Sequence, residues 1–133
     1  MASRLDGLTL LLVDDEPTVR RSMRRLLQLE GATVVEAADA DHAIQLISGG
    51  EPVIDAILLD FWLPGVSGAE LITTLKNHRP ELPLITITGE FGALPDSVGD
   101  VPLLQKPFDQ DTLVETLRSV MSSRWGGTGE PRP

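Results

Sequence analysis

The chain has 133 residues, the length of one ordinary domain, which is enough to bury a core. Its formal net charge of −9 argues against a general binder of nucleic acids or anionic membranes, and the absence of cysteine excludes disulfides and thiolate chemistry. No apolar run reaches the roughly 18–20 residues that span a bilayer, and the N-terminus MASRLDG lacks the apolar core of a signal peptide. We therefore expect a cytoplasmic protein with no membrane insertion and no direct nucleic acid binding.

Short apolar runs alternate with helical patterns. In chain order, the sequence predicts a strand at 8–13, a helix over 17–30, a strand at 33–35, a helix from Asp39 or Asp41 to Gly49-Gly50, a strand at 53–59, a helix over 67–77, strands at 82–87 and 101–104, and a helix over 109–123. The run at 53–59 is expected to be fully buried. This alternation predicts an α/β fold with a doubly wound parallel sheet. We predict one domain over 8–123, after a lead at 1–7 and before a Gly/Pro-rich, disordered tail at 124–133.

Polar side chains follow four of the predicted strands at their carboxyl ends. Asp14 and Asp15 follow the first strand, and Asp60 follows the third. Thr88 ends the fourth strand, and Lys106 follows the fifth. Ligands of doubly wound sheets bind at this edge. Three carboxylates, a hydroxyl and an ammonium suit a hard divalent cation beside a phosphoryl group. Without a cation, the three carboxylates would raise one another's pKa.

Each of these residues alone has a simpler interpretation. Asp14 or Asp15 can cap the following helix, and Asp60 can begin a turn. The threonine and the lysine can be ordinary strand-end and surface residues. Glu16 is expected to be an acid in the first turn of the helix. Only the joint placement at strand ends favours a functional site.

The chain also resembles the receiver domains of two-component response regulators and hybrid histidine kinases, from about residue 8 to 123. The resemblance rests on the acidic pair after the first strand, Asp60 after the third, the turn LPGVSG, Thr88 after the fourth, and Lys106-Pro107-Phe108 before the last helix. It implies a flavodoxin-like (βα)₅ fold with strand order 2-1-3-4-5.

The resemblance also implies roles for the residues. Asp60 would attack phosphorus and take a phosphoryl group from a phosphohistidine of a histidine kinase or a histidine phosphotransfer protein, giving an acyl phosphate. The implied Mg²⁺ site consists of Asp14, Asp15, Asp60 and the backbone carbonyl of Trp62, with Asp14 acting through water. Lys106 and Thr88 would bind the phosphoryl oxygens. Because the domain would phosphorylate itself from a partner donor, and hydrolysis of the acyl phosphate would reset it, we expect a signalling switch and not an enzyme that turns over a free substrate.

Three other classes of protein share parts of this pattern. Mg²⁺-dependent phosphohydrolases also use an aspartyl nucleophile, but they usually carry it in a D-x-D motif after the first strand, where this chain has DDEP. A flavodoxin-type electron carrier needs a phosphate-binding loop there, and acidic side chains would repel the flavin phosphate. A degenerate receiver that acts only as a binding module is disfavoured, because every pocket residue is present.

Two features depart from the receiver pattern. Leu103 stands where receivers typically carry an aromatic residue. The segment between Thr88 and Lys106 is shorter than usual and is interrupted by glycine and proline, so we expect the fourth helix to be short or missing. We expect no effector in the short tail after the last helix, and the sequence leaves open a stand-alone receiver or one excised from a hybrid kinase.

One predicted helix carries four arginines, Arg20, Arg21, Arg24 and Arg25. They can form a solvated polar face, or they can steer an acidic phosphotransfer helix of the partner. The two histidines, His42 and His78, fall in or beside helices and away from strand ends. We expect both to be exposed, and neither is a good phosphohistidine or metal ligand.

Overall fold

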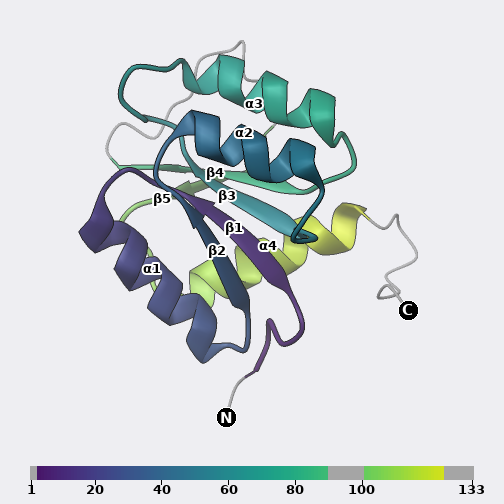
Figure 1. Cartoon of the computed structure of the whole chain (residues 1–133). Coiled ribbons are helices and arrows are strands. Elements are labelled where there is room, and N and C mark those ends of the chain that lie inside the picture. Colours follow the sequence, from purple (N-terminus) through teal and green to yellow (C-terminus); the bar gives the residue numbers. More distant parts are fainter. Residues whose placement is uncertain (1–2, 90–100, 125–133) are drawn as a thin grey trace.

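A five-stranded parallel sheet forms the centre of the structure (Figure 1). The computed structural model describes residues 3–89 and 101–124. Its strands are β1 (Thr9–Val13), β2 (Thr33–Ala37), β3 (Ala56–Asp60), β4 (Leu84–Thr88) and β5 (Leu103–Gln105). The helices of the described residues are α1 (Pro17–Leu29), α2 (Ala40–Gly49), α3 (Gly68–His78) and α4 (Gln110–Arg124). The strand order β2-β1-β3-β4-β5 confirms the predicted fold.

Both faces of the sheet are covered by helices. Helices α1 and α4 lie on one face, and α2 and α3 lie on the other (Figure 1). Successive residues of β1 point to opposite faces. Leu10 and Leu12 are buried in a cluster with residues of α1 and α4, whereas Leu11 and Val13 are buried with residues of α2 and α3. The sheet is therefore doubly wound, and its polar strand ends are left for a site.

The helix boundaries follow from local hydrogen bonds and from glycine. Of the two candidate caps of α2, Asp39 is the N-cap, and its carboxylate accepts a hydrogen bond from the His42 N–H at 2.8 Å. The helix ends at Gly50, whose φ of 80° favours glycine. In α3 the Ser67 hydroxyl oxygen accepts from the Glu70 N–H at 3.2 Å. Both helix starts were predicted to within a residue.

The prediction of a fully buried strand from residue 53 was wrong. The strand β3 begins at Ala56, and the side chain of Val53 is 67% exposed. The chain joins the sheet at Asp55, whose N–H donates to the Thr9 carbonyl and whose carboxylate accepts from the Thr9 N–H. Ile54 is buried, so side chains alternate before the strand starts and only one of the two apolar residues reaches the core.

Residues of the predicted lead pack onto the domain. Leu5 is completely buried in the cluster with α1 and α4, and its N–H donates to the Glu30 carbonyl at 2.9 Å. The Arg4 guanidinium forms ion pairs with Glu30 at 2.7 Å and with Asp111 at 3.0 Å. This segment therefore joins the end of α1 to the start of α4.

Two predictions concern residues outside the described ranges. The segment expected to lack a full fourth helix falls at 90–100, and the tail predicted from 124 is described only for Arg124, the last residue of α4. Within the described ranges, no helix is both long enough and apolar enough to cross a membrane.

Candidate functional site

The register of the sheet brings the polar strand ends to one edge. In the parallel ladder, Val13 pairs with Leu59, Asp60 with Ile87, and Thr88 with Gln105. Asp14 directly follows the last paired residue of β1, and Lys106 directly follows the last of β5. Because all the strands are parallel, these residues share the carboxyl edge. The sequence placed them on separate strands, and the sheet brings them together.

Three carboxylates meet at this edge. Asp14, Asp15 and Asp60 each offer one oxygen that lies within 4.8 Å of the other two. Asp14 is buried, Asp60 is half-buried and Asp15 is exposed. Clustered oxygen ligands of this kind suit a hard divalent cation. The carboxylate cluster could therefore bind a metal ion.

Asp14 is the most constrained of the three. Its Oδ1 accepts a hydrogen bond from the Glu16 N–H at 2.9 Å, whereas its buried Oδ2 has no hydrogen-bond partner within residues 3–89 and 101–124. The Lys106 Nζ lies 3.8 Å from Oδ2, too far for a hydrogen bond but close enough for attraction. Burial raises the pKa of Asp14 above its usual range; Asp60 and Asp15 add to this rise, against the Glu16 N–H and Lys106. A cation bound at Oδ2 would give this oxygen a partner and would offset the repulsion among the three carboxylates. The donor set therefore fits a cation.

Thr88 and Lys106 lie beside this cluster. The Lys106 N–H donates to the Thr88 carbonyl at 2.8 Å, which continues the β4–β5 ladder past its last pair. Thr88 is 1% exposed, and its hydroxyl has no hydrogen-bond partner in the part of the chain that is described. The Lys106 side chain is 27% exposed. A buried hydroxyl without a partner is uncommon and is suited to a ligand.

Asp60 is tied to the loop that follows it. Its Oδ1 accepts a hydrogen bond from the Trp62 N–H at 3.0 Å, and this bond uses only one carboxylate oxygen. The Trp62 ring is 57% exposed and packs edge to face against the buried Phe61, with ring centroids 4.8 Å apart. Gly68 faces Phe61 so closely that an added Cβ would lie 2.5 Å from the Phe61 carbonyl oxygen. The role of the Trp62 carbonyl stays a prediction.

The first turn of α1 differs from expectation. Helix α1 begins at Pro17, so Glu16 is its N-cap residue and not a first-turn acid. Its exposed side chain makes no capping hydrogen bond, and its backbone N–H donates to the Asp14 carboxylate. The two carboxylates before it are not N-caps either.

Sequence reasoning missed a contact between α1 and the acidic loop. The Arg20 Nη1 donates to the Asp14 backbone carbonyl at 2.7 Å, and Nε donates to the Glu36 carboxylate at 3.0 Å. Arg24 binds the other oxygen of Glu36. Arg21 and Arg25 are exposed, so the arginine helix has an inward pair and an outward pair. His42 and His78 are exposed, as predicted.

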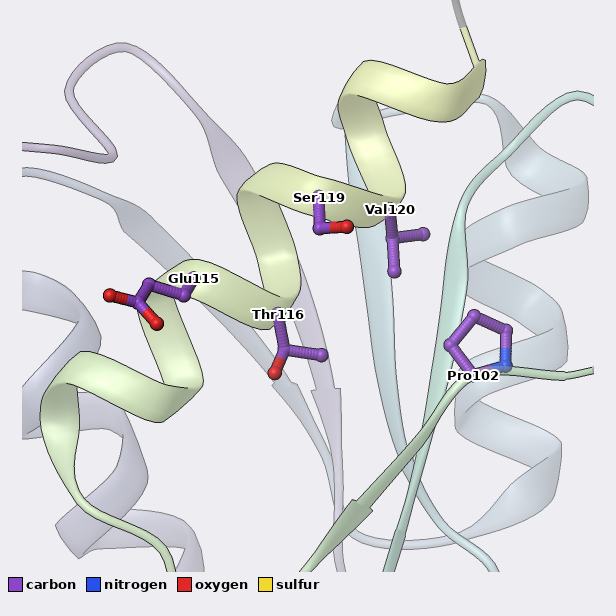
Figure 2. A pocket seen from close by; sticks show the side chains of 5 residues that line it. All are labelled: Pro102, Glu115, Thr116, Ser119 and Val120. Atoms are coloured by element: carbon purple, nitrogen blue, oxygen red, sulfur yellow. The ribbon is translucent and has the colours of Figure 1, made fainter.

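A surface hollow lies elsewhere on the molecule. It has a volume of about 510 Å³ and is lined by Pro102, Glu115, Thr116, Ser119 and Val120 (Figure 2). It opens between α4 and the segment that enters β5, whereas Lys106 follows the opposite end of that strand. None of the predicted site residues lines it, so the carboxyl edge remains the candidate site.

The fold and the carboxylate cluster define an α/β domain with a candidate cation site at the carboxyl edge of its sheet. Residues 10–118 match the family described as the response regulator receiver domain, and the chain belongs to this family. As a receiver domain it is a phosphoacceptor module of two-component signalling, which confirms the resemblance seen in the sequence.

Individual relatives agree with this assignment. The chain is 37% identical over 135 residues to the transcriptional regulatory protein TcrA of Mycobacterium tuberculosis, covering 98% of this chain and 51% of that protein. A receiver protein from Sinorhizobium medicae has a similar structure, with a TM-score of 0.78, 25% identity, and coverage of 90% of this chain and 98% of that one. The receiver domain of the hybrid histidine kinase CckA has a TM-score of 0.70 and 29% identity, over 85% of this chain and 98% of that one. The chain spans about half the length of TcrA from either strain of M. tuberculosis.

Proposed function

We propose that Asp60 is the phosphoacceptor of this receiver and takes its phosphoryl group from a phosphohistidine. The donor would be a histidine kinase or a histidine phosphotransfer protein, in the cytoplasm. One observation carries the proposal: the half-buried Asp60 carboxylate shares an edge with two further carboxylates, and the buried oxygens Asp14 Oδ2 and Thr88 Oγ1 there have no hydrogen-bond partner among the described residues.

The reaction would proceed by in-line displacement at phosphorus. A carboxylate oxygen of Asp60 forms the new P–O bond while the P–N bond to the donor histidine breaks, and the histidine leaves with the electron pair and takes up a proton. The Lys106 ammonium and the Thr88 hydroxyl would contact the equatorial oxygens, where charge is concentrated in the transition state. Attack of water on the same phosphorus would release phosphate and restore the carboxylate, so the domain would act as a switch.

Mg²⁺ is the cation that fits this chemistry. Asp14, Asp15, Asp60 and the Trp62 carbonyl would hold it, and it would supply positive charge to the phosphoryl oxygens. The fit rests on the oxygen-only donor set and on the unpaired buried oxygen of Asp14. Several ligand positions would remain for water, so we expect weak binding.

Two of the four arginines of α1 are exposed to a partner. Arg20 and Arg24 are bound to Glu36, whereas Arg21 and Arg25 are exposed. We therefore narrow the docking proposal to Arg21 and Arg25, which would steer an acidic phosphotransfer helix and raise the association rate.

The decisive experiment uses acetyl phosphate, which needs no partner protein. We expect the protein to gain one phosphoryl group in the presence of Mg²⁺, seen as an added mass in intact-protein mass spectrometry, and Asp60→Asn to gain none. Asp41→Asn is the matched control, because it removes an exposed acid on α2 and should label normally. Labelling of Asp60→Asn at the wild-type level would refute the assignment. If neither wild type nor any variant is labelled, the result favours a receiver that acts only as a binding module.

A further inference from the structure

Arg20 connects α1 to the loop that carries the acidic pair. It is 19% exposed, and its guanidinium donates at the same time to the Asp14 backbone carbonyl and to the Glu36 carboxylate of β2. Glu36 is itself held by Arg24 through its second oxygen. Since α1 lies along β2 (Figure 1), this chain of contacts joins a helix, an edge strand and the β1–α1 loop. None of these three side chains is a candidate ligand.

The contact acts on the peptide group between Asp14 and Asp15. The Asp14 N–H donates to the Ala37 carbonyl at 3.2 Å, which holds this residue against the end of β2. Its carbonyl is held by Arg20 on the other side. Because the peptide unit is planar, fixing this carbonyl also fixes the direction in which the chain enters Asp15. The exposed Asp15 has no burial to restrict it, so the orientation of this peptide is what aims its carboxylate.

We propose that Arg20 is a positioning residue of the divalent-cation site, which it serves by clamping the Asp14–Asp15 peptide against Glu36. The inference rests on the proposed function, because it assumes that the carboxylate cluster binds Mg²⁺. Its basis is the forked contact: a planar guanidinium can bond two acceptors in fixed directions, whereas a lysine ammonium is a point charge on a flexible stem. Arg20→Lys therefore keeps the charge but loses the clamp.

The test measures Mg²⁺ affinity apart from phosphorylation. In a Trp125→Phe background, Trp62 is the single tryptophan, and its backbone N–H donates to the Asp60 carboxylate, so we expect its fluorescence to change when the cation binds. We expect Arg20→Gln to raise the half-saturating Mg²⁺ concentration about tenfold or more, the usual effect of removing a residue that orients metal ligands. The Mg²⁺ concentration that half-saturates labelling by acetyl phosphate should rise by the same factor, because the variant affects labelling through its Mg²⁺ affinity.

Three variants separate positioning from charge. Arg20→Lys should lose most of the affinity that Arg20→Gln loses. Arg24→Gln leaves the contact with the Asp14 carbonyl in place and should have a small effect. Arg118→Gln removes an exposed charge from α4 and should bind Mg²⁺ normally. Full affinity in Arg20→Gln would overturn the proposal, and so would full recovery with Arg20→Lys, because charge alone would then explain the effect.

Folding is checked by urea denaturation without Mg²⁺. Where Arg20→Gln does not fold, Glu36→Gln is used instead; it weakens the other anchor of the guanidinium and should give a smaller loss of Mg²⁺ affinity. Equal affinities of Glu36→Gln and wild type would then overturn the proposal. If wild-type protein shows no Mg²⁺ response, the proposed function fails. If wild type responds and the Arg20 variants respond equally, only the positioning role fails.

Discussion

Replacing Asp14 with asparagine should stabilise the protein in the absence of Mg²⁺ and abolish its stabilisation by Mg²⁺. Asparagine has nearly the same shape, and its amide oxygen can still accept the Glu16 N–H that now binds Oδ1. Its NH₂ group would take the place of the buried, unpaired Oδ2 and would donate toward the neighbouring carboxylates. The substitution therefore removes a buried charge without leaving a cavity.

The size of the effect follows from the charges around Asp14. At an effective dielectric constant of about 20, a unit charge 4.8 Å away repels by about 3.5 kcal/mol, and the Lys106 ammonium at 3.8 Å attracts by about 4.4 kcal/mol. Two carboxylates repel and one ammonium attracts, so a net repulsion of about 2.6 kcal/mol remains, and solvent around the exposed Asp15 screens part of it. The buried Asp14 Oδ2, which has no hydrogen-bond partner among the described residues, destabilises the folded state by about 1–3 kcal/mol more. We expect Asp14→Asn to raise the free energy of unfolding without Mg²⁺ by a net amount on the order of 1–3 kcal/mol.

Urea denaturation with and without Mg²⁺ measures both parts of this prediction. Wild type should gain stability as Mg²⁺ is added, because the cation binds only the folded state, and Asp14→Asn should not. Asp39→Asn keeps a capping side chain on α2 and serves as a control with the same chemical change at an exposed site. An Asp14→Asn protein that is less stable than wild type without Mg²⁺ would refute the electrostatic reasoning.

Two further predictions concern charged residues outside the cluster. Charge reversal at Arg21 and Arg25 should slow phosphotransfer from the partner and weaken its dependence on salt, while labelling by acetyl phosphate stays unchanged; equal slowing with both donors would mean damage to the site itself. The Arg4 guanidinium lowers the pKa of Glu30 to about 2 from an ordinary 4.5. The ionised Glu30 carboxylate therefore contributes its full stability above pH 4.5, and this contribution is lost as the pH falls toward 2. Urea midpoints of Glu30→Gln should fall less than those of wild type across this range; parallel curves for the two proteins would contradict this.

The sequence predicts the carboxyl edge of the sheet well because the edge depends on strand ends alone. An apolar run that stops at a polar residue marks where a buried strand leaves the sheet, and parallel strands put all such residues on one side. Asp60, Thr88 and Lys106 could therefore be assigned to one place without knowledge of any side-chain contact. The same reasoning failed at Val53, because an apolar residue next to a strand need not belong to it.

Contacts between elements could not be predicted in this way. The spacing of the arginines in α1 indicates a helix face, but it does not say which side chain reaches an acceptor. That depends on Glu36, which the register of β2 against β1 places within reach of Arg20 and Arg24. Likewise, nothing in the short N-terminal segment shows that Leu5 enters the core, because a single apolar residue has no periodicity.

Helix α1 joins the proposed docking surface to the proposed metal site. Arg21 and Arg25 are exposed, while Arg20, on the same helix, donates to the backbone carbonyl of Asp14. Because its own hydrogen bonds fix φ and ψ, a helix can move as a unit, and we expect a displacement at Arg21 and Arg25 to shift Arg20 as well. By linkage, any factor by which Mg²⁺ changes the affinity for the partner must equal the factor by which the partner changes the affinity for Mg²⁺. If both proposals hold, donor binding and the ordering of the metal ligands would be coupled through α1, at the contact between Arg20 and the Asp14 carbonyl.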